Sequence, residues 1–326
     1  MKLPRRQFLH LAAGAAALPG VSRFAWAQGW PTKPIRAIVP FTAGSAVDII
    51  PRTVFDPLSR ELGQSIIVEN RTGAGGTIGA AVVARADPDG HTILVNSSAH
   101  TVIPSLYPKA PYDTARDFSG VIPLGALPNV LVVDPSKGYK SLRDLVVAAK
   151  AKSGSITYAS AGVGSATHFS AERLRLSAGF DGVHVPFRGA PEAYTEVMTG
   201  RVDFFFGALT SALPFIRDGK LQALAVSTPK RASALADVPT TLEAGFTNSD
   251  YTFWVAIFVP AKTASAVVEK LHQQTQKTLQ SASLREKLAT LGVEPMIMSP
   301  AELDALVKAE IAANVTVVKA ANIKAE

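Results

Sequence analysis

The sequence predicts an α/β protein built on open sheets. Two observations carry this prediction. Short apolar runs rich in β-branched residues recur along the chain, and stretches with helical periodicity separate them. Because these runs are apolar throughout, without alternation, they are typical of buried parallel strands. The strands are expected at 35–39, 65–69, 92–95, 130–133, 155–159, 183–185, 202–206, 222–226 and 254–259.

Helix end signals support the helical segments between these strands. Ser141 is placed to cap a helix over 142–152, and Asp144, three residues on, completes a capping-box pattern. Pro191 opens another helix, which is expected to close near Gly200. These signals fix helix boundaries that periodicity alone leaves open.

The C-terminal helix has the clearest start signal. Ser299 and Glu302 form a capping-box pattern, and the apolar residues that follow share one helical face. The residues expected to be buried on that face are Leu303, Leu306, Val307, Ile311, Val315 and Val318.

The chain of 326 residues is long enough for two domains. Candidate crossings between them lie at 123–128 and 248–253. We therefore expect a first lobe made of 28–127 and 251–326, with a second lobe inserted as 128–250.

The first 27 residues are typical of an export signal. They combine a basic start that includes Arg5 and Arg6, an Ala-rich apolar run over 8–18, and the small-x-small cleavage pattern Ala25-Trp26-Ala27. The apolar run is shorter than the roughly 20 residues that a permanent membrane helix needs. The arginine pair also matches a twin-arginine signal, and the choice between the two export routes stays open. We expect cleavage near Ala27, a periplasmic mature protein and no membrane-embedded segment in it.

Charge and cysteine content exclude several classes of function. The chain carries a formal charge of +7, and residues 1–27 hold four basic and no acidic residues, so 7 − 4 = +3 remains on the other 326 − 27 = 299 residues. A value this small favours no nucleic-acid partner. The absence of cysteine removes thiol catalysis and cysteine-ligated metals, and the histidines lack metal-ligand spacing, so no metal and no cofactor is expected.

Two loops of small residues are the strongest candidates for a binding site. One, over 41–48, follows the apolar run 35–39 and precedes a helix, and the other, over 160–168, lies in the second predicted lobe. Each leaves backbone N–H groups at the positive end of a helix dipole, which favours an anion. The sequence therefore predicts a cleft with an anion-binding loop on each side.

Other motifs fail on spacing. The glycines of 73–79 do not fit the dinucleotide pattern, because the last glycine falls one residue late. No nucleophile-elbow motif occurs. His168 follows Ser165 by three residues, which places the two on one helical turn without an orienting acid. The pocket candidates offer N–H and hydroxyl donors, which suits binding and release of a carboxylate more than acid–base chemistry.

Three further side chains are candidates on separate grounds. Asp48 in the first helical turn is expected to hold the loop shape, with a ligand amine as its alternative partner. Arg188 follows an apolar strand in a loop, where it either meets a carboxylate or is solvent-exposed. Ser97, at the end of the run 92–95, offers a further hydroxyl.

The chain resembles the solute-binding proteins of tripartite tricarboxylate transporters, the Bug family. The resemblance runs across the mature chain in ordered blocks. These are Ile38-Val39-Pro40-Phe41 with Gly44 and Asp48, Val68-Glu69-Asn70-Arg71 with Gly73-Ala74-Gly75-Gly76, Ala86-Asp87-Pro88-Asp89-Gly90, Tyr158-Ala159-Ser160-Ala161-Gly162 with Gly164-Ser165 and His168, Val183-His184-Val185-Pro186-Phe187, Gly200-Arg201-Val202-Asp203, Gly219-Lys220-Leu221 and Ala236-Asp237-Val238-Pro239-Thr240.

The resemblance implies a type II periplasmic-binding-protein fold, in which two α/β lobes close on a small carboxylate. It implies delivery of that ligand to the membrane permease subunits of the transporter by a monomeric receptor. Two departures bear on ligand identity: Ser45 stands where many relatives have glycine, and Gly207 where relatives often have aspartate. The expected ligand-binding residues are Phe41, Thr42, Gly44, Ser45, Asp48, Ser97, Ser160, Gly162, Gly164, Ser165, Thr167, His168, Arg188 and Gly207.

Three functions follow as hypotheses. The first is a non-enzymatic receptor for an organic carboxylate. The second is a hydrolase on a similar scaffold that uses Ser165 or Ser45 as nucleophile, and the third is a carboxylate sensor that feeds a signalling partner. The sequence does not identify the carboxylate, its affinity or the membrane partner.

Overall fold

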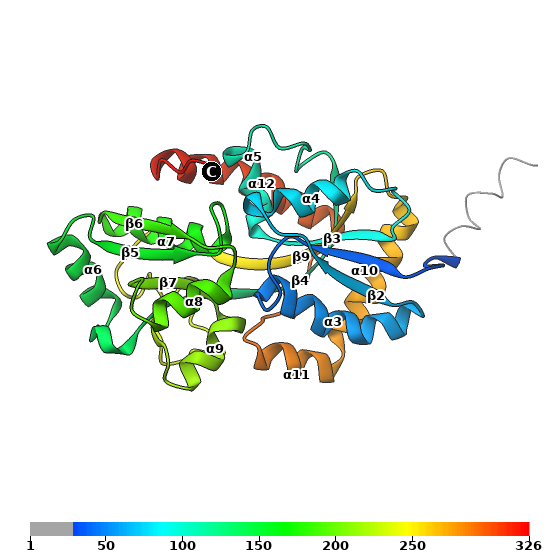
Figure 1. The fold of residues 1–326 in the computed structure, drawn as a ribbon. Coiled ribbons are helices and arrows are strands. Elements are labelled where there is room, and N and C mark those ends of the chain that lie inside the picture. Colours follow the sequence, from blue (N-terminus) through cyan, green and yellow to red (C-terminus); the bar gives the residue numbers. More distant parts are fainter. Residues whose placement is uncertain (1–28, 326) are drawn as a thin grey trace, which may run out of the picture.

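The structure, a computed structural model, describes residues 29–325, and the expected export signal lies outside this range. Figure 1 shows an elongated α/β molecule, which confirms the predicted class. Its strands are β1 (Ile35–Val39), β2 (Ile66–Asn70), β3 (Thr92–Ser97), β4 (Phe118–Val133), β5 (Ile156–Ser160), β6 (Gly182–Pro186), β7 (Phe204–Ala208), β8 (Gln222–Val226) and β9 (Thr252–Pro260). Its α-helices are α3 (Ala46–Leu62), α4 (Thr77–Ala84), α5 (Ile103–Leu106), α6 (Leu142–Ala151), α7 (Ala166–Ala178), α8 (Ala190–Met198), α9 (Leu209–Arg217), α10 (Ser265–Gln280), α11 (Ala282–Thr290) and α12 (Pro300–Ala320).

The strands form one path in the order β2-β1-β3-β9-β4-β7-β5-β6, with β8 beside β4. Parallel pairs, β1 with β2 and β3, and β5 with β6 and β7, lie toward the two ends of this path. The expectation of parallel strands throughout is wrong for β4 and β9, which pair antiparallel with every partner they have. These two strands pass between the two halves of the molecule in opposite directions (Figure 1).

Strand β4 divides the sheet path into two lobes. Its residues Phe118–Pro128 pair with β9, whereas Asn129–Val132 pair with β7. We call the part built on β1, β2 and β3 the first lobe and the part built on β5, β6, β7 and β8 the second lobe. The sequence predicted only the last four residues of β4, because Gly120, Pro123 and other breakers interrupt the apolar pattern before them.

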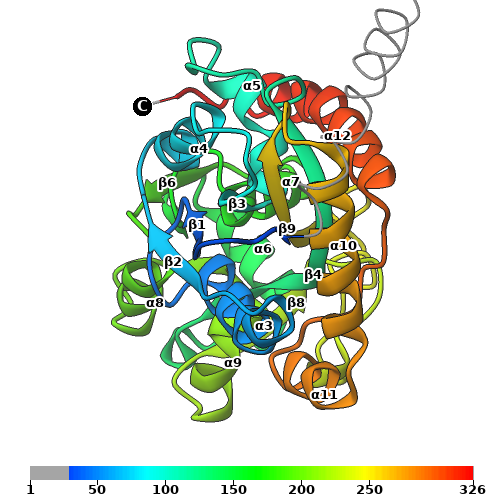
Figure 2. The same ribbon diagram turned by 90° about the vertical axis from the view of Figure 1, so that its right-hand side faces the viewer.

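Helices cover both faces of each lobe (Figures 1 and 2). In the first lobe, α3, α10 and α11 pack on one core cluster, and α4 and α12 pack on a second cluster. In the second lobe, α6 and α7 share one cluster, and α8 and α9 share the other. The helices bury both faces of each half-sheet. The loops at the strand ends are left uncovered and can form a site between the lobes.

The predicted helix caps are largely present. The full capping box of Ser299 and Glu302 opens α12. At α6 the Ser141 hydroxyl accepts from the Asp144 N–H at 3.2 Å, but the Asp144 carboxylate accepts from the backbone N–H of Lys140 rather than that of Ser141. On α12 the expectation for Val315 is wrong, since it is 37% exposed, and Asn314 is buried in its place.

Candidate ligand-binding site

A small cavity lies between the two lobes, where the carboxyl ends of strands from both meet. Its volume is about 30 Å³, so the lobes are closed on each other. The first lobe contributes Phe41, Ser45, Ala46, Val47, Ser97 and Phe253, and the second contributes Ala161, Ser165, Ala166, Thr167, Ala190, Ala208 and Ser211.

Four helices point their N-termini at this cavity. Helices α3, α7 and α8 each place their first residue in the cavity wall, and α9 follows directly from Ala208, which lines it. The backbone N–H groups of Ala46, Val47, Ala166 and Thr167 have no acceptor among the described residues. Free N–H groups and the positive ends of four helix dipoles together favour an anion here.

Asp48 holds the first loop in shape. Its carboxylate accepts from the Gly44 N–H at 3.0 Å, from Arg52 Nε at 2.8 Å and from Asn70 Nδ2 at 3.0 Å. Asn70 Nδ2 also donates to the Phe41 carbonyl at 2.9 Å. Asp48 does not line the cavity. This geometry fits the loop-holding role expected for Asp48, because both of its carboxylate oxygens already accept hydrogen bonds.

The first loop also holds two buried hydroxyls without a partner. Ser45 occupies the N-cap position of α3, but its hydroxyl caps nothing. The Thr42 hydroxyl is likewise buried without a hydrogen bond among the described residues, and Thr42 lies close against Gly189 of the second lobe. A buried hydroxyl without a partner costs free energy, so these two groups mark a place where a ligand can supply the acceptor.

The hydroxyls of the second loop are satisfied within the loop. Ser165 Oγ accepts from the His168 N–H at 3.3 Å and shares a 2.9 Å hydrogen bond with Thr167 Oγ1. Thr167 Oγ1 also accepts from the Ala161 N–H at 2.9 Å. The Gly164 N–H donates to His168 Nδ1 at 3.2 Å. Gly162 and Gly164 adopt left-handed φ values of 112° and 81°, which this tight turn requires.

A buried ionisable network supports this loop from below. Because His168 Nδ1 accepts from Gly164, its Nε2 carries the proton and faces Glu172 Oε1 at 3.6 Å. Burial raises the pKa of Glu172, but hydrogen bonds from His168, Tyr158 and Arg175 outweigh it and lower that pKa to about 2. His184 stacks on His168 with ring centroids 3.8 Å apart, and burial lowers the pKa of His184 to about 3.

The arrangement does not form a nucleophile with a base. His184 Nε2 is 2.7 Å from Ser160 Oγ, but Ser160 is fully buried, also accepts from the Gly162 N–H, and does not line the cavity. Ser165, which does line it, has no imidazole nitrogen as partner. The chemistry of the cavity is therefore binding by hydrogen bonds and dipoles.

Three other expected site residues have different placements. Ser97 lines the cavity and accepts from the Ala99 N–H at 3.3 Å. Arg188 is exposed and lies outside the cavity wall. Gly207 is buried behind the wall, where a Cβ would overlap the hydroxyl of Tyr194, so glycine at this position makes room for that side chain.

Several wall residues were missed by sequence reasoning. Ser211 on α9 and Ala190 on α8 both lie in the first turn of a helix that follows a second-lobe strand. The same strand-to-helix pattern that singled out 41–48 and 160–168 could have found them. Phe253, near the start of β9, had no such signal.

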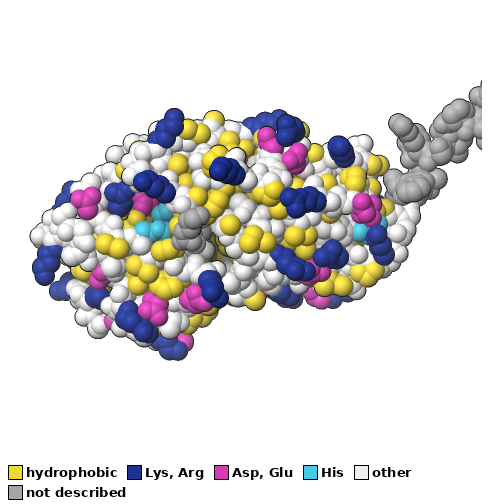
Figure 3. Space-filling view, turned by 45° about the horizontal axis from the view of Figure 1, so that its top comes forward, with side chains coloured by type: hydrophobic (Ala, Val, Ile, Leu, Met, Phe, Trp, Pro, Cys, Tyr) yellow, Lys and Arg dark blue, Asp and Glu magenta, His cyan; other side chains and the backbone are white. Residues whose placement is uncertain are grey.

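Neither the face drawn in Figure 3 nor the metal-ligating side chains of residues 29–325 suggest a second site for a polyanion or a metal. Figure 3 shows cationic and anionic side chains interspersed over the face it presents, without a continuous basic patch. Within residues 29–325 no group of three or more metal-ligating side chains occurs. Across this same range, none of the helices has both the length and the apolar character needed to cross a membrane.

Two α/β lobes that close on a small cavity of N–H and hydroxyl donors define a periplasmic-binding-protein type of receptor. Residues 50–323 match the family model described as tripartite tricarboxylate transporter family receptor. The chain belongs to this family of solute-binding receptors, also called TctC or Bug proteins, and it is a receptor, not an enzyme.

Known relatives are similar to this chain over nearly its whole length. Protein BugT of Bordetella pertussis is 32% identical over 90% of this chain and 91% of that protein. The structure of Rpa4515 of R. palustris with adipate has a TM-score of 0.87 at 32% identity and covers 90% of this chain and 99% of that one. MatC of Rhodopseudomonas palustris with bound malate has a TM-score of 0.84 at 31% identity and covers 89% and 100%.

Proposed function

We propose that this receptor captures a small organic carboxylate between its lobes in the periplasm and delivers it to the permease subunits of a tripartite tricarboxylate transporter. The observation that carries the proposal is the convergence of four helix N-termini on a cavity that also holds the unpartnered hydroxyl of Ser45. A carboxylate oxygen supplies the acceptor that these donors lack.

The ligand class follows from the donors. No Lys or Arg side chain of the described residues lines the cavity, so the carboxylate is held by N–H groups, hydroxyls and bridging water. The structures of the relatives with adipate and malate support a dicarboxylate. Direct contacts are assigned to Phe41, Ser45, Ser97, Ser165 and Thr167, which line the cavity.

The remaining expected residues act around the contact residues. Thr42 offers its hydroxyl when the lobes open, and Gly162 and Gly164 allow the turn of the second loop. Gly44, Asp48, Ser160 and His168 hold the loops in shape. Arg188 and Gly207 are assigned no direct contact.

A dicarboxylate requires the lobes to part, since about 30 Å³ holds little more than one or two water molecules. The hinge is placed where β4 changes partner, between Pro128 and Asn129, and where β9 begins at Thr252. We propose that the first lobe comprises 28–127 and 251–326 and the second lobe 128–250, bounds that lie within one residue of these changes of strand partner. Ligand binding and lobe closure are then one linked equilibrium.

Export and partners complete the proposal. The N-terminal signal, of the twin-arginine type, is removed near Ala27, and the mature chain acts as a monomer. A sensor role, in which the closed receptor contacts a signalling partner, uses the same site and differs only in the membrane partner. Deletion of the permease genes separates the two, because uptake is lost only if the receptor serves transport.

A thermal-shift screen of the chain from residue 28, with mono-, di- and tricarboxylates, aromatic acids and amino acids, tests the ligand class. A ligand at a hundred times its Kd stabilises the folded state by about 2.7 kcal/mol, so a binder is readily seen. A shift with dicarboxylates such as adipate or malate supports the proposal, and their recovery intact after incubation agrees with a receptor. A shift with amino acids alone contradicts it.

A further inference from the structure

A second cavity lies away from the cleft, on the first lobe. It is a groove of about 750 Å³ between α10, α11, the segment 293–297 and the first half of β4. Small-molecule sites usually fall between roughly 300 and 1,000 Å³. None of its lining residues belongs to the wall of the interlobe cavity, so the groove is a separate place on the molecule.

The groove is apolar at its floor and at its rim. Ile122, Leu124 and Val293 form the floor and are each at most 3% exposed. Ile297 lies at the rim and is 69% exposed, which is the highest value among the exposed large hydrophobic residues of the described chain. Exposed apolar surface of this kind, continuous with a concave floor, is typical of a site that takes an apolar body.

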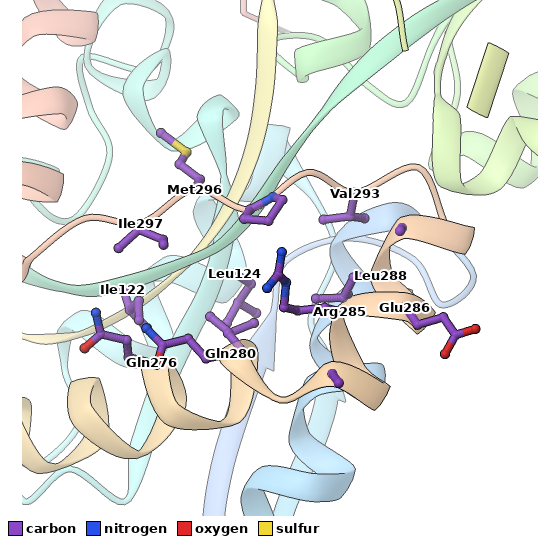
Figure 4. A pocket seen from close by; sticks show the side chains of 14 residues that line it. Ile122, Leu124, Gln276, Gln280, Arg285, Glu286, Leu288, Val293, Met296 and Ile297 are labelled. Atoms are coloured by element: carbon purple, nitrogen blue, oxygen red, sulfur yellow. The ribbon is translucent and has the colours of Figure 1, made fainter. Parts of the chain in front are cut away.

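One cation reaches into this apolar groove. Figure 4 shows the guanidinium of Arg285 extending from α11 into the space beside Leu124, while the carboxylate of Glu286 points away from it. Among residues 29–325 the Arg285 side chain has neither an ion pair nor a hydrogen bond. The amides of Gln276 and Gln280 on α10 flank the same space and can add donors.

We propose that this groove binds an amphipathic monocarboxylate, with its alkyl or aryl body against Ile122, Leu124 and Val293 and its carboxylate on Arg285. Charge complementarity selects the anion, because of the two charged described residues that line the groove, Arg285 directs its guanidinium inward and Glu286 points away. The apolar floor selects against the small, fully polar acids that suit the interlobe cavity. The two sites therefore take different classes of acid.

The groove lies next to a contact between the lobes. Thr210 of α9 donates its hydroxyl to the Leu291 carbonyl at 2.9 Å, two residues before the floor residue Val293. The proposal itself concerns binding, and it does not depend on the identity of the ligand in the cleft.

Methionine methyl groups give a direct readout of the groove. The chain has four methionines, Met1, Met198, Met296 and Met298, of which Met296 lines the groove and Met198 lies at the end of α8 in the second lobe. In protein labelled with ¹³C at the methionine methyl, decanoate below its micelle concentration should shift the Met296 resonance saturably and leave that of Met198 in place. A Met296→Leu variant assigns the resonance.

Matched variants test the role of the charge. Arg285→Gln should weaken decanoate binding by about fivefold or more, whereas Lys287→Gln, which removes an exposed cation on the same helix outside the groove, should not. Decanol should bind the parent and Arg285→Gln proteins equally. Equal decanoate affinity in the parent and Arg285→Gln, or no saturable shift of Met296, overturns the proposal. A Met296 resonance that depends on protein concentration without decanoate also overturns it, because a second copy of the chain would then cover the groove.

Discussion

Two serines hold the same N-cap position on helices that point at the cleft, yet the structure gives them different roles. The Ser165 hydroxyl caps α7 by accepting from the His168 N–H at 3.3 Å. The Ser45 hydroxyl at the start of α3 is buried and has no partner. Replacing each by alanine removes the same atom from the same kind of position, so the pair forms its own control.

The stability effects should differ in magnitude. Loss of an N-cap hydroxyl that makes its bond costs about 1 kcal/mol, and Ser165→Ala should lower the unfolding free energy by that amount. Ser45→Ala breaks no hydrogen bond and removes a buried polar atom that lacks a partner, so its unfolding free energy should stay within about 0.5 kcal/mol of the parent or rise.

The Ser45 hydroxyl should matter for ligand affinity rather than for ligand-free stability. A hydroxyl that donates to a carboxylate is worth about 1.5 kcal/mol at the low end of charge-assisted bonds, which is about tenfold in Kd. Ser45→Ala should therefore bind the carboxylate found in the thermal-shift screen about tenfold more weakly while its ligand-free stability is unchanged.

Urea unfolding without ligand and calorimetric titration with the carboxylate measure the two quantities. The reasoning is refuted if Ser45→Ala loses 1 kcal/mol or more of ligand-free stability, since the hydroxyl would then be a cap. It is also refuted if the variant binds the carboxylate with the affinity of the parent, since Ser45 would then not be a ligand donor.

Three other predictions concern packing, pH and processing. Gly207→Ala should lower the unfolding free energy by about 1–3 kcal/mol, because the new Cβ meets the buried Tyr194 hydroxyl. Gly29→Ala, where the new Cβ meets nothing within 4 Å, should leave the unfolding free energy unchanged. Equal urea midpoints for the two variants would contradict this. Burial lowers the pKa of His184 from 6.5 to about 3, so between these values the unfolded chain binds a proton that the folded chain does not. The unfolding free energy should therefore fall as pH falls through this window, by up to about 1.4 kcal/mol per pH unit for this group. In urea unfolding between pH 6.5 and 4, His184→Asn should make this dependence on pH weaker. An unchanged dependence would show that His184 is not its source. N-terminal sequencing of the exported protein should begin at Gln28, and an N-terminus upstream of residue 20 would contradict the cleavage site.

The sequence was a good guide to the strand-end loops and a poor guide to the connection between the lobes. Small residues between an apolar run and a helix start predict a free helix N-terminus whatever the rest of the fold does, and both loops lie at the cavity. The antiparallel course of β4 could not be predicted locally. Gly120 and Pro123 weaken the strand signal, and only the long-range pairing with β9 keeps the segment extended.

The sequence also could not predict which serine hydroxyl makes a capping hydrogen bond. Ser45 and Ser165 both precede a helix, and nothing in their neighbours distinguishes a hydroxyl that caps from one that does not. Their backbone angles are also nearly equal, with φ −75° and ψ 161° at Ser45 and φ −67° and ψ 159° at Ser165, so the local backbone conformation does not distinguish them either. Gly207 illustrates the same limit, because its neighbour Tyr194 is thirteen residues away in sequence and packs there only once α8 lies on β7.

A cavity built from dipoles suits a receptor that must release its cargo. A buried guanidinium that faced the carboxylate would leave an unpaired charge behind each time the ligand departed, and an unpaired buried charge costs several kcal/mol. Helix N-termini and hydroxyls carry only partial charges, so the site without ligand is less penalised and water can replace the carboxylate as the lobes open. The unpartnered hydroxyls of Thr42 and Ser45 then favour closure on a ligand over closure without one. Closure without a ligand leaves both hydroxyls without an acceptor, whereas closure on a carboxylate gives Ser45 an acceptor. The residues proposed to bind the ligand would thus make the closed state depend on its presence, and a permease or sensor that recognises the closed lobes would respond only to the ligand-bound receptor.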